Sequence, residues 1–432
     1  MNLSETSGPV RRVLEHSLEG YDPTVDEGTV LLSATGADLA ALMQVADHLR
    51  RVQVGDVVTY VVNRNINFTN VCIKTCRFCA YARGLRSEEG YLLPPEEVAH
   101  RAAEAVAFGV TEICIQAGLA PSVDPETYLR YTRVVKEAAP GLHLHAWSPE
   151  EVRYGAARAG TSIAAWIAEL MAAGVNSLPG TSAEILDDSV RRRIAPGRIT
   201  SAEWEEVVRS AHALGLPTTS TIMYGHVETP RHRAAHLARI RAIQRDTGGF
   251  TEFVPLSFVA AEAPLSRLTA GRLPGPSEDT VLALYATARL MLGRHLPNLQ
   301  VSWVKEGPAR AVKLLGCGGN DLGGTLLNES ISTAAGSGYG QRLAPAELTA
   351  LATAAGRPAA ERTTLYQRRP TSAAPHPLDA LPPDDARFGS YAALLQDTRF
   401  RYEPAPRSSR ARSSGRSRSS AVPGDPTVTT RP

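Results

Sequence analysis

The feature that most constrains this fold is a regular alternation of short apolar, β-prone runs with longer amphipathic stretches, which begins near residue 56. Strands are predicted at 57–67, 112–116, 142–146, 175–178, 217–223, 252–258, 299–304 and 320–325. Helices are predicted at 94–109, 125–139, 148–173 in two pieces, 202–214, 229–247, 276–293 and 307–315. Seven or eight such units over about 270 residues predict an α/β fold with a TIM-type (β/α) barrel, complete or nearly so. A doubly wound open sheet is the alternative.

The flanking segments differ from this pattern. Residues 1–55 predict an N-terminal helical extension, because "SATGADLAALMQVADHLR" spaces its apolar residues as a helix does. Residues 56–330 are then the barrel core, and 331–365 a C-terminal helical segment. Residues 366–432 predict a mostly disordered tail rich in Arg, Ser and Pro, since they lack the apolar content that offsets ordering entropy.

Charge and hydropathy narrow the class of protein. Of the formal charge of +2, residues 401–432 contribute +5, from seven arginines against two acidic residues, so the remaining body carries −3. That body lacks the basic surface of a nucleic-acid binder, so nucleic acid is not an expected partner. No stretch offers the ~18 uninterrupted apolar residues of a membrane span, and we find no secretion signal. We therefore expect no membrane association and a cytoplasmic location, where thiols stay reduced.

Three of the five cysteines, Cys72, Cys76 and Cys79, fall within "NVCIKTCRFCAY", directly after the first predicted strand. Barrel sites gather at that end of the strands. A structural zinc site needs four ligands, and the fourth would have to be Cys114, Cys317 or a distant histidine. A 4Fe-4S cluster held by three cysteines leaves one iron free for an exogenous ligand. Because Cys114 and Cys317 lie in segments typical of small packed residues, the pattern favours the cluster.

The spacing C-x3-C-x2-C, with Phe78 before the last cysteine, resembles the signature of the radical S-adenosylmethionine (SAM) enzymes. The resemblance implies that the free iron binds the methionine part of SAM and that Phe78 lies against the adenine. From about residue 30 to 365 the chain is also similar to the CofH family of FO (deazaflavin) synthesis. The similar blocks are "SLPGTSAEILDD", "STIMYGHVETPRHR", "TGGFTEFVPLSF", "VSWVKEG" and "GCGGNDLGGTLLNESIS".

The CofH resemblance implies a transferase that breaks the Cα–Cβ bond of L-tyrosine. The 4-hydroxybenzyl group then joins C5 of 5-amino-6-(D-ribitylamino)uracil, and 2-iminoacetate is released. A low-potential electron donor would reduce the cluster, and CofG, a second radical enzyme, would close the ring. With one cysteine triplet, the chain would perform the first half alone. The alternatives are a futalosine-pathway enzyme of menaquinone synthesis, which shares the cysteine loop, and a zinc-stabilised protein whose Arg/Ser tail binds nucleic acid.

Further candidate residues lie in the matched blocks. Gln116 and Gly118 end a strand near the cysteine loop, where backbone groups in this superfamily bond the SAM amino group. Ser177 and Glu184 are candidates to hold the ribose or methionine polar groups of SAM. An ordinary βα turn and an acidic residue in the first turn of a helix are the structural alternatives. Ala117 stands where the family usually has glycine, which is tolerated if φ is negative.

Tyr224 and His226, in "MYGHVET", are the candidate catalytic residues, because the strand before them is expected to aim polar side chains into the barrel mouth. His226 would donate to the tyrosine phenol or transfer a proton, since its ordinary pKa is about 6.5. A packed, hydrogen-bonded histidine is the alternative. After "FVPLSF" the chain reads "VAAEAPL" where the family often carries a histidine, and this departure bears on substrate identity.

Overall fold

The computed structural model describes residues 3–370, 374–381 and 390–404. Its strands are short and mostly buried, and they are β1 (Val58–Val61), β2 (Asn63–Ile66), β3 (Glu112–Ile115), β4 (His143–Ala146), β5 (Thr218–Tyr224), β6 (Phe250–Ser257), β7 (Asp321–Gly324) and β8 (Ala359–Glu361). Two further predicted strands are present only as isolated bridges near residues 177 and 300. The strands other than β8, whose three residues are half-buried, are mostly buried on both faces, as expected where helices cover a parallel sheet.

The strand pairings close into a ring. β2 pairs with β3 and β3 with β4, all parallel. The parallel bridges His145–Ser177 and Leu178–Thr218 carry the order on to β5, which pairs with β6. Bridges at 299–300 lead from β6 to β7, and β7 pairs with β1. Because β1 runs on into β2, the last pairing returns to the first, and the predicted TIM-type barrel is confirmed.

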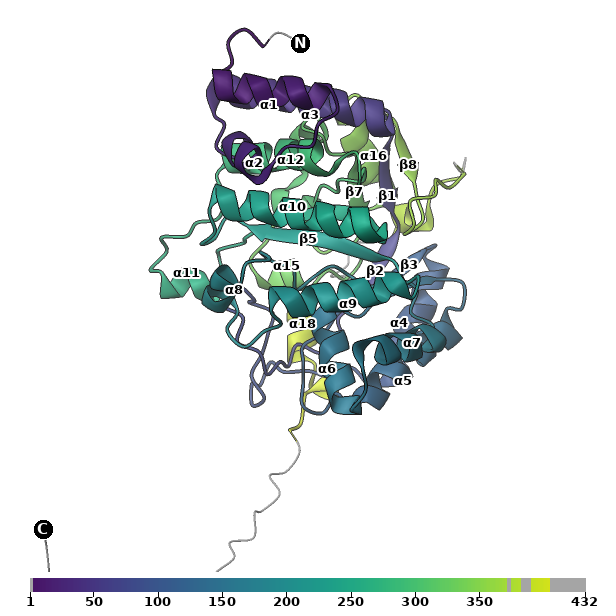
Figure 1. Cartoon of the computed structure of the whole chain (residues 1–432). Helices are drawn as coiled ribbons and strands as arrows, with labels where there is room; N and C mark the ends of the chain where they lie inside the picture. Colours follow the sequence, from purple (N-terminus) through teal and green to yellow (C-terminus); the bar gives the residue numbers. More distant parts are fainter. Residues whose placement is uncertain (1–2, 371–373, 382–389, 405–432) are drawn as a thin grey trace, which may run out of the picture.

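Helices flank the strands on several sides (Figure 1). They are α1 (Gly8–Leu18), α2 (Val25–Leu31), α3 (Gly36–Val54), α4 (Pro95–Ala107), α5 (Pro125–Ala138), α6 (Pro149–Ala159), α7 (Ile163–Ala173), α8 (Asp188–Ile194), α9 (Ser201–Ala213), α10 (Pro230–Thr247), α11 (Pro264–Leu268), α12 (Glu278–Leu292), α13 (Trp303–Glu306), α14 (Pro308–Leu315), α15 (Ile331–Ala334), α16 (Pro345–Ala354) and α18 (Tyr391–Gln396), with 3-10 turns η1 (Pro377–Ala380) and η2 (Thr398–Phe400).

Local signals explain where the long helices begin. Asp124, Ser148, Thr200 and Thr229 each precede a helix and accept a hydrogen bond from the backbone amide three residues further on. Each cap satisfies an amide that would otherwise be unpaired at the helix start. The barrel helices therefore lie within about two residues of their predicted bounds. The short helices α8, α11 and α13 were not predicted, because they are too short to show a repeating apolar pattern.

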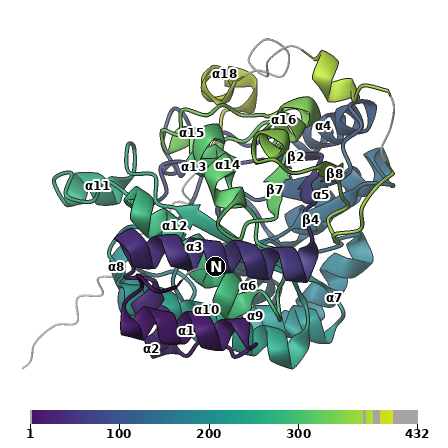
Figure 2. The ribbon, with the colours of Figure 1, turned by 90° about the horizontal axis from the view of Figure 1, so that it is seen from above.

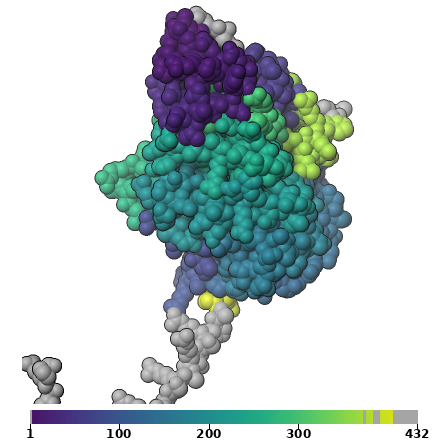
Figure 3. Space-filling view, viewed as in Figure 1, coloured from purple at the N-terminus to yellow at the C-terminus, as the bar shows by residue number. Residues whose placement is uncertain are grey.

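Helices α1 to α3 form one end of the molecule (Figures 1 and 3) and lie over α10 and α12 (Figure 2). Gly28 of α2 allows this close packing, since an added Cβ would lie 2.6 Å from the sulfur of Met291 on α12. Within the described part of the chain, no single helix is long and apolar enough to cross a membrane, although α2 and α3 together, bent by 116°, pass that test by length and composition.

The link between α10 and the barrel depends on a neutral histidine. His236 is buried, its Nδ1 accepts from the Leu186 amide at 3.1 Å, and its Nε2 lies 2.9 Å from the Thr221 carbonyl of β5. Burial lowers the pKa of His236 from its ordinary 6.5 to about 3. Nδ1 accepts and Nε2 donates only while the ring is neutral.

We expect this histidine to make the protein acid-sensitive. Between pH 6.5 and about 3, His236 is protonated in the unfolded chain and neutral in the folded one. The free energy of unfolding therefore falls as the pH drops through that window, by about 1.4 kcal/mol per pH unit for this group. This pH dependence can be checked by urea unfolding of the wild type and of His236→Gln at pH 7.5, 6.0 and 5.0. The variant should show the shallower pH dependence, and equal slopes would contradict the assignment.

The segment 331–365, predicted to be helical, also contains a strand. β8 (Ala359–Glu361) pairs parallel with β1 after α16. Its residues, Ala-Ala-Glu, include no β-branched or aromatic side chain, so no local pattern predicts a strand here. Its register comes instead from backbone bonds to β1, such as the bond from the Arg362 amide to the Tyr60 carbonyl at 2.8 Å.

The tail at 366–432, predicted to be mostly disordered, contains short ordered elements within residues 374–381 and 390–404. Leu378, Phe400 and Tyr402 are buried. The Leu92 amide donates to the Phe400 carbonyl and the Tyr402 amide to the Gly90 carbonyl, both at 2.8 Å. Residues 90–92 therefore supply a pairing edge that the tail composition cannot reveal. Residues 405–432, which hold most of the tail arginines, lie outside the described residues.

Candidate active site

The cysteine loop follows β2 and crosses the carboxyl end of the barrel. Its backbone is fixed on both sides: the Cys72 amide donates to the Arg83 carbonyl at 3.0 Å, and the Ile73 amide to the Leu119 carbonyl at 2.9 Å. The Cys79 amide donates to the Cys76 carbonyl at 3.2 Å, which turns the loop back on itself. Cys72, Cys76 and Cys79 are thereby brought to one cavity.

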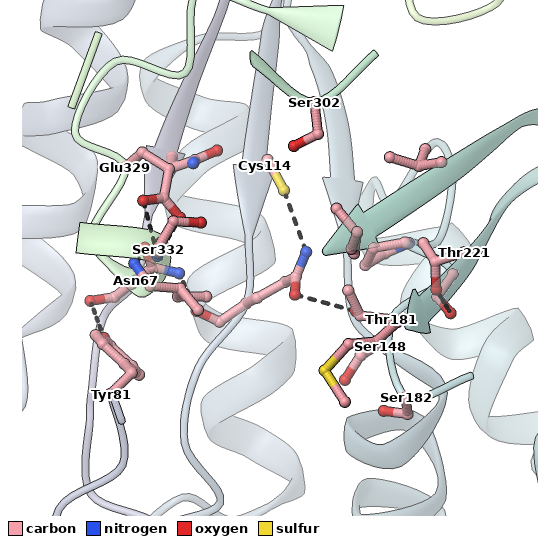
Figure 4. Close-up of a pocket in the computed structure, with 18 of the residues that line it drawn as sticks. Asn67, Tyr81, Cys114, Ser148, Thr181, Ser182, Thr221, Ser302, Glu329 and Ser332 are labelled. Carbon is pink, nitrogen blue, oxygen red and sulfur yellow. Dashed lines mark hydrogen bonds between the residues drawn. The ribbon is translucent and has the colours of Figure 1, made fainter. Parts of the chain in front are cut away.

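The cavity has a volume of about 390 Å³ and occupies the mouth and interior of the barrel. Figure 4 shows Asn67, Tyr81, Glu329 and Ser332 on one side, and Thr181, Ser182, Ser148 and Thr221 on the other. This volume falls in the range of small-molecule sites. Alternate residues of each strand point inward, for example Asn63, Asn65 and Asn67 from β2 and beyond, and Glu112, Cys114 and Gln116 from β3 and beyond.

The three thiols have the chemistry of iron–sulfur ligands. A 4Fe-4S cluster takes one thiolate on each of separate irons, so three cysteines brought to one cavity leave one iron free. Burial raises the pKa of the Cys76 thiol to about 12, so this thiol keeps its proton until a cationic centre binds. The loop thus has the donor chemistry that a cubane cluster needs.

Gly118 fits directly against the cysteine loop. Its amide donates to the Thr69 carbonyl at 2.9 Å, and an added Cβ would lie only 2.3 Å from the Val71 carbonyl oxygen. Gln116 lines the cavity beside it: the Gln116 carbonyl accepts from Asn67 Nδ2 at 2.7 Å. Ala117 is absent from the described non-glycine residues with positive φ, so the departure from glycine is tolerated there. Its amide donates to Glu151 Oε1 at 3.1 Å.

We expect Gly118→Ala to displace the cysteine loop, because neither the Val71 backbone nor the β3 end can yield without breaking its hydrogen bonds. Overpacking of this kind costs about 1–3 kcal/mol of stability. The variant should bind less iron per chain after anaerobic reconstitution. Gly141→Ala, where an added Cβ meets nothing within 4 Å, is the matched control. Iron contents equal to wild type in both variants would contradict this reading.

A buried ionic network lies beside the thiols. Arg198 donates to Glu184 Oε1 at 2.9 Å, to Ser182 Oγ at 2.6 Å and to Glu150 Oε2 at 3.2 Å. Its guanidinium lies 5.8 Å from the centre of the Phe78 ring, which also lines the cavity. Burial disfavours the charged form of Arg198, but the carboxylates of Glu184 and Glu150 outweigh this effect and hold the Arg198 pKa well above its ordinary value. Arg198 therefore adds positive charge next to the thiols.

Two buried acceptors in the cavity wall lack partners in the described structure. Glu184 Oε2 and Asn67 Oδ1 are both buried and accept no hydrogen bond. Glu184 also has φ of +38°, an uncommon backbone conformation for a non-glycine residue. Buried polar atoms without partners are costly, so a ligand that donates to them would stabilise the site. The hydroxyl and amino groups of a nucleoside-amino acid such as SAM are donors of this kind.

The structure does not bring Ser177 to the cavity. Its hydroxyl is buried between His143 Nε2, at 2.7 Å, and His145 Nδ1, at 2.6 Å. Thr181 and Ser182, a few residues further on, line the cavity instead. The prediction named the correct segment but a residue too early along it, because the Ser177 hydroxyl is taken up by the two histidines, whereas Thr181 and Ser182 line the cavity.

Tyr224 and His226 also lie outside the cavity lining. Thr219, Thr221 and Met223 of β5 point inward, so the strand period of two turns Tyr224 outward. The Tyr224 hydroxyl lies 3.3 Å from Glu306 Oε1 and 3.0 Å from Ser257 Oγ. His226 packs in the wall, with Nδ1 accepting from the Val227 amide at 2.7 Å and Nε2 3.0 Å from the Met223 carbonyl. The packed-histidine alternative describes this placement.

The floor of the cavity is a buried arginine network. Arg362, which follows β8, donates to Asp321 Oδ2 at 2.5 Å and Oδ1 at 2.9 Å, and to Glu252 Oε2 at 3.4 Å. The Tyr366 ring lies 3.9 Å from its guanidinium carbon, and the Tyr366 hydroxyl donates to Glu252. These groups close the amino end of the barrel and leave the cysteine mouth as the open side.

Sequence reasoning missed several residues of the lining. Arg198, Lys305 and Glu329 line the cavity but were not singled out. Lys305 lies in "VSWVKEG", just after a predicted strand, and that position was an available signal. Cys114, expected to be a packed residue, also lines the cavity, where its sulfur accepts from Gln116 Nε2 at 3.6 Å.

The chain matches two known families. The family described as the radical SAM superfamily matches residues 66–240, and the one described as the CofH/MqnC C-terminal region matches 247–374. The "5-amino-6-(D-ribitylamino)uracil--L-tyrosine 4-hydroxyphenyl transferase" of Methanopyrus kandleri is 48% identical over 344 residues, which are 79% of this chain and 93% of that protein. The FO synthase of Streptomyces coelicolor is 50% identical over 348 residues, 80% of this chain but 40% of that protein. The chain thus spans less than half of the FO synthases it matches.

Solved structures share the fold. Methylornithine synthase (PylB) superposes with a TM-score of 0.64 at 19% identity, over 81% of this chain and 97% of that one. The FeFe-hydrogenase maturase HydG from Carboxydothermus hydrogenoformans gives 0.62 at 14% identity, over 83% and 80%. At these identities the likeness concerns the arrangement of strands and helices. It agrees with the barrel read from the strand pairings.

Proposed function

This chain belongs to the radical SAM superfamily and, within it, to the family with the CofH/MqnC C-terminal region, and on that premise we propose that it transfers the 4-hydroxybenzyl group of L-tyrosine to 5-amino-6-(D-ribitylamino)uracil. The observation that carries the proposal is the match to the M. kandleri transferase, which spans nearly that whole protein. The bond broken is Cα–Cβ of tyrosine, and the bond formed joins the benzylic carbon to C5 of the uracil. The amino-acid remainder leaves as 2-iminoacetate.

Radical SAM enzymes use a 4Fe-4S cluster and SAM, and Cys72, Cys76 and Cys79 occupy the characteristic motif. When bound, these cofactors supply an oxidising carbon radical that removes hydrogen from a substrate bond. The chain holds the cluster loop through the backbone bonds of Cys72 and Ile73. It also encloses the reacting groups in a cavity away from bulk water, which limits side reactions.

Individual roles follow from the placement of each side chain. Glu184, through its free Oε2, and the Gln116–Gly118 turn are proposed to hold the polar groups of SAM, with Phe78 beside the adenine. Ser177 is proposed to orient His145, which lines the cavity. It would therefore act through His145 and not by touching a ligand itself. Tyr224 and His226 are proposed to shape the wall from behind, since their polar atoms are engaged within it.

The test is an anaerobic incubation of reconstituted protein with SAM, reductant, tyrosine labelled with 13C at Cβ, and the ribitylaminouracil. The expected products are the benzylated uracil carrying the label, 2-iminoacetate (detected as glyoxylate) and 5'-deoxyadenosine. Omission of either substrate should suppress the coupled product. Deoxyadenosine formed without any labelled uracil would reject the proposed substrates.

A second candidate is a futalosine-pathway reaction of menaquinone synthesis. The observation that favours it is the C-terminal family itself, whose description names both CofH and MqnC. The same assay with dehypoxanthine futalosine in place of tyrosine and the uracil decides between the two. Turnover of that compound alone would assign the chain to the second reaction.

The remaining partners belong to the same proposal. We propose that a low-potential electron donor reduces the cluster, that CofG closes the ring of the product, and that the reaction takes place in the cytoplasm. In support, the cysteine loop carries three free thiols, which need a reducing compartment. FO should form when CofG is added to the assay above, and no FO should form without it.

A further inference from the structure

Lys305 stands out among the charged side chains of the cavity. It lies in α13, directly after the short strand near residue 300, and so at the carboxyl end of the barrel. Its side chain lines the cavity. Burial lowers the pKa of Lys305, and the nearby carboxylates of Glu329 and Glu306 oppose this effect. A buried ammonium is unfavourable unless an anion compensates it.

The other cationic side chains of the cavity are already neutralised. Lys and Arg contribute four residues to the lining, the other three being Lys74, Arg198 and Arg362. Lys74 pairs with Glu150 at 3.0 Å, Arg198 with Glu184 at 2.9 Å, and Arg362 with Asp321 at 2.5 Å. The backbone amide of Lys305 donates to the Ser302 carbonyl, but the Lys305 ammonium makes no hydrogen bond or ion pair with any residue that the structure describes. It is therefore available for an anion from a ligand.

The acidic neighbours of Lys305 are committed elsewhere. The Glu329 carboxylate accepts from the amides of Ile331, Ser332 and Thr333 at the start of α15, at 2.9–3.3 Å. Glu306 pairs with Arg310 at 3.1 Å and accepts from the hydroxyls of Tyr224 and Ser257. These bonds hold both carboxylates in place, outside ion-pair distance of the Lys305 ammonium.

We propose that Lys305 binds the α-carboxylate of the amino-acid substrate. The inference rests on the proposed function. Of the two proposed substrates, only tyrosine carries a permanent negative charge, because the uracil and its ribityl chain are neutral. The SAM carboxylate is expected at the free iron of the cluster. The tyrosine carboxylate stays on the fragment that leaves as 2-iminoacetate, so Lys305 would hold the departing portion while the benzylic carbon moves to the uracil.

The test measures binding rather than turnover. Anaerobically reconstituted holoprotein loaded with SAM, without reductant, is titrated calorimetrically with L-tyrosine, L-tyrosinamide and L-phenylalanine. The proteins are the wild type, Lys305→Met and Lys305→Arg. Met keeps the length of the stem and removes the buried charge, so folding is not impaired. Lys313→Met is the matched control, because Lys313 pairs with Glu278 on the surface, where its side chain is 59% exposed.

We expect Lys305→Met to weaken tyrosine binding about ten- to a hundredfold, the effect of one charge-assisted hydrogen bond. The variant should bind tyrosine and tyrosinamide alike, whereas the wild type, Lys313→Met and, in part, Lys305→Arg should prefer tyrosine. Persistence of the wild-type preference in Lys305→Met overturns the inference and leaves the proposed function standing. Loss of discrimination against phenylalanine, with tyrosinamide still rejected, also overturns it, since Lys305 would then read the phenol. Failure of the wild type to bind tyrosine at all rejects the proposed function instead.

Discussion

We expect Cys76→Ser to lose both the cluster and all turnover. Serine offers a harder oxygen ligand, and the pKa of its hydroxyl is much higher than that of a thiol. The iron of such clusters is held by thiolates. The loop would still fold, because its backbone bonds do not involve the Cys76 thiol. After anaerobic reconstitution, iron should fall from about four atoms per chain to a small residue. No 5'-deoxyadenosine should form in the presence of SAM and reductant.

Two other cysteines supply the controls. Cys317 is buried away from the cavity and donates to the Lys313 carbonyl at 3.2 Å, a bond that serine can reproduce, so Cys317→Ser should keep its iron and its activity. Cys114 lines the cavity. Cys114→Ser should keep its iron, even if its turnover rate changes. Loss of iron in Cys114→Ser would make Cys114 a fourth ligand, leave no iron free, and contradict the site described above.

The second large effect is expected at the barrel floor. Arg362 is 2% exposed and its partner Asp321 is fully buried, so Arg362→Met leaves a buried carboxylate without its cation. Breaking a buried pair in this way costs about 3–5 kcal/mol. The midpoint of urea unfolding, followed by the fluorescence of the buried tryptophans, should fall accordingly. Replacing both partners, as in Arg362→Met with Asp321→Asn, should recover part of the loss, because the buried Asp321 charge is removed and only Glu252 then lacks its cation.

The matched control lies seven residues further along. Arg369 pairs with Glu361 at 2.9 Å, but its side chain is 46% exposed. Exposed pairs contribute about 0–1 kcal/mol, so Arg369→Met should change the unfolding midpoint little. Equal losses in the two variants would show that the effect belongs to the segment and not to burial of the Arg362–Asp321 pair.

The barrel could be predicted because most of its strands have a recognisable sequence pattern. Strands covered on both sides by helices often appear in the sequence as short apolar runs, such as "ICI" in β3. The helices between them begin at recognisable capping residues. The three motif cysteines were predictable because Cys72, Cys76 and Cys79 lie within eight positions of one loop and their spacing is the whole signal. Neither inference needs contacts between distant parts of the chain.

The remainder of the site depends on such contacts. Arg198 meets Glu150, and Arg362 meets Asp321, across more than forty residues of sequence, and no local pattern specifies those pairs. Tyr224 was misplaced because the sequence marks the end of β5 but not which of its two faces turns inward. Thr219 and Thr221 could have indicated which face of β5 turns inward. Both line the barrel interior, and Tyr224 lies on the opposite face of the strand.

The bridge between Tyr91 and Arg401, with the Tyr391 ring 5.6 Å from that of Tyr81, has a consequence for how the enzyme matures. More than three hundred residues separate the cysteine loop from the segment at 390–404 that packs against its flank. At about 5–20 residues per second, the ribosome needs roughly 15–65 s to add that segment. During this interval the loop lacks these contacts, so it acquires its final packing only after residue 402 has been translated.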